Sequence, residues 1–168
     1  MSQVGAAAGG MDVTSLYEEA LRTAFPAERI DGGAAFAQWG SSYPIATAYR
    51  NAIDSKTWEQ LDRAYIIKRD DALGFLSTRE LVQLLPVYLR SVMVEGLASP
   101  ALEAVLVKLT RPKSVATRAR YDALLAALSP AQRDTIVAAL QHLVDQDPDG
   151  SIGRDARAAK FDVEGRIV

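Results

Sequence analysis

The chain has 168 residues, of which 49% are hydrophobic and 24% are charged, and its formal net charge is −2. This composition excludes a wholly disordered chain, and the length suffices for one domain around a single hydrophobic core. A weak negative charge gives no general attraction to phosphate backbones or to anionic lipids. We therefore expect neither a nucleic acid nor a membrane as the partner.

The chain contains no cysteine, which excludes a disulfide framework and a thiolate metal site. A cysteine-free chain suits a reducing compartment, and we expect it to be cytoplasmic. No segment approaches the roughly 20 apolar residues that cross a bilayer. The opening residues lack the basic start and the long apolar run of a secretory signal, so we interpret residues 1–11 as a flexible leader.

Apolar residues at three- and four-residue spacing predict α-helices along most of the chain. The first predicted helix ends at Pro26, the second ends near Ile53, and a third begins at Trp58. Residues 27–43 are rich in glycine and serine and predict a loop between the first two.

The longest predicted helix runs from Ser77 to Leu97, and apolar side chains fall on nearly all of its faces. Ser77 and Glu80 have the spacing of a capping box at its start. Pro86 removes one backbone hydrogen bond and crowds the preceding turn, so we expect a kink or a break near Leu85. This segment is predicted to be the buried central helix.

Serine and proline mark the starts of the later helices. Ser99 and Pro100 precede one periodic segment, Tyr121 lies in the next, and Ser129 with Gln132 forms a capping box before the last. The predicted fold class is therefore all-α, a compact bundle of about seven short helices around a central proline-kinked helix.

This helical domain is predicted to span residues 12–150. Residues 151–168 place Phe161, Val163 and Ile167 among charged residues, without a clear helical period. A short strand, an ordered extension along the core and disorder all fit this pattern. We favour a loosely attached C-terminal extension.

The sharpest local motif is a candidate calcium loop after the last predicted helix. Asp145, Asp147 and Asp149 occupy positions 1, 3 and 5 of an EF-hand-like loop, Gly150 occupies position 6, and Ser151 offers its backbone carbonyl at position 7. Carboxylates at this spacing can converge on a hard cation. A degenerate Ca²⁺ site is therefore one hypothesis for this loop.

The second half of the calcium template is missing, because Ala156 occupies position 12, where a bidentate carboxylate is needed. Clustered Asp, Pro and Gly residues after a helix are also typical of a terminating turn whose side chains cap free backbone amides. A weaker match that ends at Glu80 is explained by the capping box at Ser77. We therefore expect no cofactor, with Ca²⁺ as the alternative.

Residues suited to catalysis are sparse. His142 is the only histidine, and helical spacing places it opposite the apolar face, where we expect it to be exposed. The sequence contains no Gly-x-Ser-x-Gly elbow, no glycine-rich phosphate loop and no His-Glu-x-x-His helix. We expect no enzyme, and a carboxylate-dependent enzyme is the alternative, because a carboxylate pair needs no fixed spacing.

Arg111, Lys113, Arg118 and Arg120 form a basic cluster between two predicted helices. A helix, a turn and a second helix can dock into a DNA major groove. However, the chain is acidic overall, and neither helix carries the Arg, Asn or Gln spacing of a recognition helix. We interpret the cluster as a solvated connection.

The segments Trp58–Leu61, Ala72–Ser77, Leu85–Leu89 and Leu128–Gln132 resemble the core of a family of small uncharacterised bacterial proteins. In that family a tryptophan precedes a Phe-Leu-Ser/Thr motif and a Leu-Pro-x-Tyr-Leu motif. The similarity covers residues 57–144. The resemblance implies a helical fold and a bacterial origin.

Small bacterial proteins of this kind can be immunity partners of secreted toxins, and this analogy suggests a function. Our leading hypothesis is a non-enzymatic protein-binding protein, an immunity protein that neutralises a bacterial toxin. The alternatives are a calcium-responsive helical domain and a carboxylate-dependent enzyme. The large apolar residues of the shared motifs are expected to pack in the core; they are Trp58, Phe75, Leu85, Tyr88 and Leu89.

Overall fold

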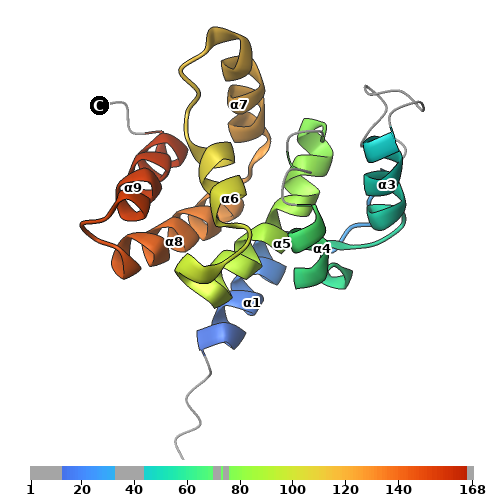
Figure 1. Ribbon diagram of the computed structural model, residues 1–168, viewed down its shortest axis with the longest axis horizontal. Helices are drawn as coiled ribbons and strands as arrows, with labels where there is room; N and C mark the ends of the chain where they lie inside the picture. Colours follow the sequence, from blue (N-terminus) through green and yellow to red (C-terminus); the bar gives the residue numbers. More distant parts are fainter. Residues whose placement is uncertain (1–12, 33–43, 70–72, 74–75, 166–168) are drawn as a thin grey trace, which may run out of the picture.

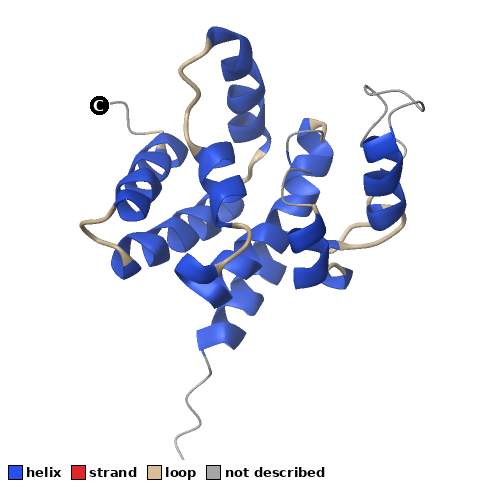
Figure 2. Cartoon of the chain, in the orientation of Figure 1, coloured by secondary structure: helices blue, strands red, loops and turns tan. Residues whose placement is uncertain are grey.

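The computed structural model describes residues 13–32, 44–69, 73 and 76–165. Within these ranges the regular structure is helical, and Figure 2 shows helices joined by loops, without a strand. The predicted all-α fold class is therefore confirmed. The predicted leader and most of the predicted 27–43 loop lie outside the described residues.

The described residues form eight α-helices and two short 3₁₀ helices, where about seven helices were expected. Figure 1 shows their arrangement, with α3 at one end of the molecule and α9 at the other. In chain order the elements are α1 (Val13–Ala24), α3 (Pro44–Ile53), η2 (Trp58–Gln60), α4 (Arg63–Lys68), α5 (Thr78–Glu95), η4 (Gly96–Ala98), α6 (Leu102–Leu109), α7 (Val115–Ala127), α8 (Pro130–Gln146) and α9 (Ser151–Glu164).

Helix α5 is the centre of the fold, as predicted. It packs against α1, α6, α7 and α8, and η2 and α4 cover it further. The helix is continuous through Pro86, which is itself buried, so a break near Leu85 does not occur. A proline in a helix interior costs about 3 kcal/mol, and burial of α5 on several sides offsets this cost.

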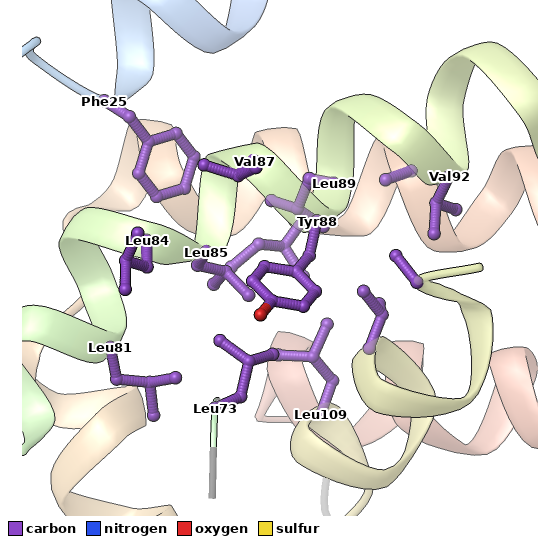
Figure 3. Close-up of a cluster of buried hydrophobic side chains, with 14 of the residues drawn as sticks. Phe25, Leu73, Leu81, Leu84, Leu85, Val87, Tyr88, Leu89, Val92 and Leu109 are labelled. Atoms are coloured by element: carbon purple, nitrogen blue, oxygen red, sulfur yellow. The ribbon is translucent and has the colours of Figure 1, made fainter. Parts of the chain in front are cut away.

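The core around α5 is shown in Figure 3, where the ring of Tyr88 lies among leucine side chains that include Leu73, Leu85 and Leu109. The Tyr88 side chain is completely buried, and its hydroxyl donates to the backbone carbonyl of Arg69 at 2.7 Å. Trp58 is also buried, and its indole N–H donates to the carbonyl of Phe25 at 2.9 Å. Both aromatic residues therefore bury their rings with the polar atom satisfied.

These contacts confirm the core role of four of the five motif residues. Trp58, Leu85, Tyr88 and Leu89 are each at most 2% exposed, whereas Phe75 lies outside the described residues. The motif thus has a sufficient structural explanation in packing.

The segment from Thr78 to Ala98 is long and apolar enough to cross a membrane by length and composition alone. No other described segment meets this test. Most of it is buried inside the protein, as the core helix of a globular domain is. This finding is therefore weak support for a membrane span.

The C-terminal segment differs from its prediction, because residues 151–164 form helix α9 and not a loose extension. Helix α9 packs against α8 more extensively than any other pair of elements does in the described part of the chain, and it also packs against α6. Its buried face consists of Gly153, Ala156, Ala159 and Val163. Three of these residues are small, so the helical period carried little hydrophobic contrast in the sequence.

The two predicted capping boxes have different outcomes. Ser129 and Gln132 form the reciprocal pair of hydrogen bonds at the start of α8. Ser77 is the N-cap of α5, but its side chain makes no capping hydrogen bond, and Glu80 is buried with one carboxylate oxygen lacking a hydrogen-bond partner. Spacing alone therefore identified the helix start correctly at both sites but the hydrogen bonds at only one.

His142 is not the exposed side chain that we expected. It is half-buried between α1 and α8, where its Nδ1 lies 3.2 Å from the hydroxyl of Tyr17 and its Nε2 lies 3.0 Å from the side-chain nitrogen of Gln146. The same Gln146 side chain accepts the backbone N–H of Leu97 at 3.1 Å. The histidine thus belongs to a structural network that joins α1, α8 and η4.

Candidate functional site

The candidate calcium loop joins α8 to α9, and the structure uses its carboxylates in separate ways. Asp145 accepts a hydrogen bond from Gln141 at 2.7 Å, one turn earlier in α8. Asp147 accepts the backbone N–H of Gly153 at 3.1 Å, and Asp149 is exposed. No group of three or more His, Asp or Glu side chains that could hold a metal ion occurs among the described residues. The structure therefore does not bring the predicted ligands together.

Asp147 acts as a cap for α9, as the alternative interpretation of the loop predicted. Its carboxylate satisfies the N–H of Gly153 in the first turn of that helix, where backbone donors lack partners within the helix. Arg157 closes the same turn from the other side by donating to the carbonyl of Pro148 at 2.9 Å. Ser151 is the first residue of α9 and is exposed.

Replacing Asp147 with alanine is expected to lower the free energy of unfolding by about 1 kcal/mol, because an N–H at the start of α9 loses its acceptor. The matched variants Asp145→Ala and Asp149→Ala should change it by less than about 0.5 kcal/mol. Urea unfolding measures all three. A calcium site would show a different pattern: heat on addition of millimolar CaCl₂ to the wild-type protein, reduced in each of the three variants.

A cavity of about 570 Å³ lies between α6, α7 and the start of α5, and we call it the α6–α7 groove. It exists because the two helices rest on different neighbours: α7 packs mainly against α5, whereas α6 packs mainly against α9 and α5. Its volume falls within the roughly 300–1,000 Å³ of typical binding pockets. Its buried floor is formed by Leu76, Leu81, Leu106, Tyr121 and Leu124.

The rim of the α6–α7 groove is basic. Four cationic side chains line it, and Asp155 is the one acidic residue among the described lining residues. The cations are Lys108, Arg111, Lys113 and Arg120. Three of them belong to the basic cluster seen in the sequence, whereas Arg118 does not line the groove and its guanidinium donates to the carbonyl of Lys113 at 3.4 Å.

Lys108 is the groove residue that sequence reasoning missed. It lies inside the apolar period of α6, three residues before Arg111, and is half-buried at the groove. Burial, reinforced by the nearby charge of Arg120, lowers the pKa of Lys108 below its ordinary value. Arg120 is held in place by its hydrogen bond to the carbonyl of Leu76, at 2.9 Å. The two positive charges therefore share a partly desolvated site that favours an anion.

Tyr121 contributes its ring to the floor and not an ionisable group to the rim. Its hydroxyl donates to the carbonyl of Leu109 at 3.4 Å. Burial, with a smaller contribution from the charge of Asp162, raises the pKa of Tyr121 above its ordinary value. The tyrosine is therefore uncharged at neutral pH.

The apolar character of the groove extends to the surface. Val107 lines it and is 69% exposed, and Val115, the first residue of α7, is 79% exposed. Apolar side chains this accessible next to an apolar floor are typical of a binding surface. Two other described cavities, at α8–α9 and at α1–α5, have mixed charges, with Arg133, Asp134 and Glu164 in one and Glu28 and Arg79 in the other. The α6–α7 groove is therefore our candidate functional site.

The architecture defines an all-α protein with a basic, apolar-floored groove. The chain belongs to DUF6714, a family of unknown function whose profile matches residues 19–160. Neither the comparison with curated proteins nor the comparison with solved structures yields a match. The matched range includes both the α5 core and the α6–α7 groove, so the expected membership of an uncharacterised family is confirmed.

Proposed function

We propose that the chain is a non-enzymatic protein-binding protein that contacts its partner through the α6–α7 groove. The observation that supports this proposal is the combination of a buried apolar floor, an exposed valine at its edge and four cations around it. Stable protein interfaces have this organisation, with an apolar centre that gives affinity and a charged rim that gives orientation.

The position of Val107 favours a macromolecule over a small ligand. Its side chain projects from α6 and remains 69% exposed, so a ligand confined to the cavity would leave it in water. A protein partner that covers the edge would bury Val107 together with the floor. Removing apolar surface from water contributes about 25 cal/mol per Å² and is the main favourable term in most protein association.

The partner class that we propose is a bacterial toxin, which the chain neutralises in the cytoplasm. An immunity protein works by covering a surface of the toxin, and for this it needs a rigid scaffold with one recognition face. The helical core around α5 supplies such a scaffold, and the groove supplies the face. One carboxylate, Asp155, lines the groove, which offers no support there for a carboxylate pair.

The Val107→Glu variant is expected to lose the partner, because it places a like-for-unlike charge and a desolvated carboxylate where an apolar contact is made. We expect binding to weaken at least about ten-fold. The measurement is recovery of the native partner with tagged protein in the source cells, together with survival of cells that express the neighbouring toxin gene.

The matched control is Leu16→Glu, which changes another exposed apolar residue, 46% exposed on α1. This variant should recover the partner and protect cells as the wild-type protein does. Equal behaviour of the two variants, or a toxin that stays lethal beside the wild-type chain, would contradict the proposal.

A further inference from the structure

We infer that the segment bound in the α6–α7 groove is an acidic amphipathic helix of the partner, with one of its carboxylates seated between Lys108 and Arg120. This inference rests on the proposed function and identifies the chemistry of the occupant. It also assigns a recognition role to Lys108.

The charge distribution is the first support. The whole chain carries a formal charge of −2, yet the groove gathers four cations and one carboxylate. A concave surface with low-dielectric walls focuses the field of such a cluster. The groove therefore attracts an acidic segment and repels a basic one, although the protein as a whole does neither.

The second support is the partial burial of the cationic pair. Lys108 is half-buried and feels the positive charge of Arg120, and both effects disfavour its charged form. A carboxylate placed between the two residues would neutralise this repulsion in a desolvated site. Arg120 can present its guanidinium from a fixed position, because it is already bonded to the carbonyl of Leu76.

The apolar floor explains why the occupant is amphipathic. Leu81 comes from α5, Leu106 from α6 and Leu124 from α7, so the floor is a surface between three helices. An amphipathic helix can lay apolar residues at three- and four-residue spacing into such a surface. A nucleic acid would leave the leucines unused, and it would find no exposed aromatic face here, because Tyr121 is 5% exposed.

The test uses three synthetic amphipathic peptides of roughly 18 residues, about five helical turns, with one leucine face and either glutamate, glutamine or lysine on the flanks. Fluorescence anisotropy measures their binding to the full chain. We expect the glutamate peptide to bind at least about ten-fold more tightly than the glutamine peptide, and the lysine peptide to bind weakest. Raising the salt concentration from about 50 to about 500 mM should remove most of this preference.

Charge variants locate the effect. Lys108→Met keeps the apolar stem and should weaken the glutamate peptide about ten-fold, and the double variant Lys108→Glu/Lys113→Glu should prefer the lysine peptide. The control Lys56→Glu reverses one exposed charge between α3 and η2 and should leave all three affinities unchanged. Circular dichroism confirms that each variant is folded; if Lys108→Glu unfolds, Lys113→Glu with Lys108→Met replaces it.

The pH dependence of binding has a definite sign. A bound carboxylate favours protonated Lys108, so the affinity should be constant below the lowered pKa of Lys108 in the free protein and should fall as the pH rises through it. Lys108→Met should remove this part of the decrease. The charged and titratable groups that line the same groove are Arg111, Lys113, Arg120, Tyr121 and Asp155, and they are common to both proteins.

Three results would overturn the inference: equal binding of the glutamine or lysine peptide, tighter binding of a duplex oligonucleotide, or a dimer of the chain that Val107→Glu dissociates. If Val107→Glu loses the native partner but the glutamate peptide does not bind, the proposed function stands and the acidic-helix inference is wrong. If Val107→Glu keeps the native partner, the proposed function itself is wrong.

Discussion

Replacing Gly153 with alanine should destabilise the protein by about 3 kcal/mol or more, the largest effect that we expect from a single added methyl group. A Cβ atom at this position would lie 1.7 Å from the backbone carbonyl oxygen of Asp147. A backbone atom cannot rotate away as the end of a side chain can. The turn between α8 and α9 would therefore have to open, and the Asp147 cap and the packing of α9 on α8 would be weakened together.

Urea unfolding followed by far-ultraviolet circular dichroism measures this effect. The matched control is Ser151→Ala, which changes an exposed side chain two residues earlier in α9 and should alter the free energy of unfolding by less than about 0.5 kcal/mol. A loss below about 1 kcal/mol for Gly153→Ala would mean that α9 does not approach the end of α8 as closely as described.

Replacing Tyr88 with alanine should cost about 3–5 kcal/mol, as expected for removal of a large aromatic side chain from a core. The residue is completely buried, and its ring packs edge-on against that of Tyr65, with centroids 6.5 Å apart. Its hydroxyl is satisfied by the carbonyl of Arg69. Alanine would remove the ring, its contacts and the hydrogen bond at once.

The conservative variant Tyr88→Phe separates these contributions. It keeps the ring and loses the hydrogen bond to Arg69, so we expect a loss of about 1 kcal/mol. Partner binding by the folded Tyr88→Phe protein should equal that of the wild-type protein. If Tyr88→Phe keeps full stability but loses the partner, the Leu-Pro-x-Tyr-Leu motif has a recognition role and the groove is not the whole binding site.

The fold class could be predicted because most helices carry a strong hydrophobic period. Helix α5 buries large residues on nearly every side, and α8 begins with a serine–glutamine capping box, so both were clear in the sequence. Helix α9 was missed for a physical reason. Its inner face consists mainly of glycine and alanine, which pack by close approach and leave almost no trace in a hydrophobicity pattern.

The α6–α7 groove could be predicted only in part. Arg111, Lys113 and Arg120 stood out as a basic cluster, but their meaning depends on a cavity whose floor includes Leu76 and Leu81 from a distant part of the chain. The packing of α6 on α9 and of α7 on α5 creates that cavity, and no local pattern records it.

The Asp145–Ser151 loop shows the opposite relation between motif and structure. Its acidic residues were conspicuous, yet the decisive contact is the hydrogen bond from Gly153 to Asp147, six residues apart. The motif spacing of a calcium loop and that of a helix cap overlap at this residue. Only the position of α9 distinguishes them.

The central claim, that a partner protein lies in the α6–α7 groove, is tested most directly by a photoreactive amino acid at Val107 in the full chain. The control places it at Glu19, an exposed residue on α1. After irradiation in the source cells, mass spectrometry identifies the cross-linked peptide. We predict one partner cross-linked from position 107, through an acidic segment with apolar residues, and not from position 19. Cross-linking of that partner from position 19 and not from position 107 would contradict the claim.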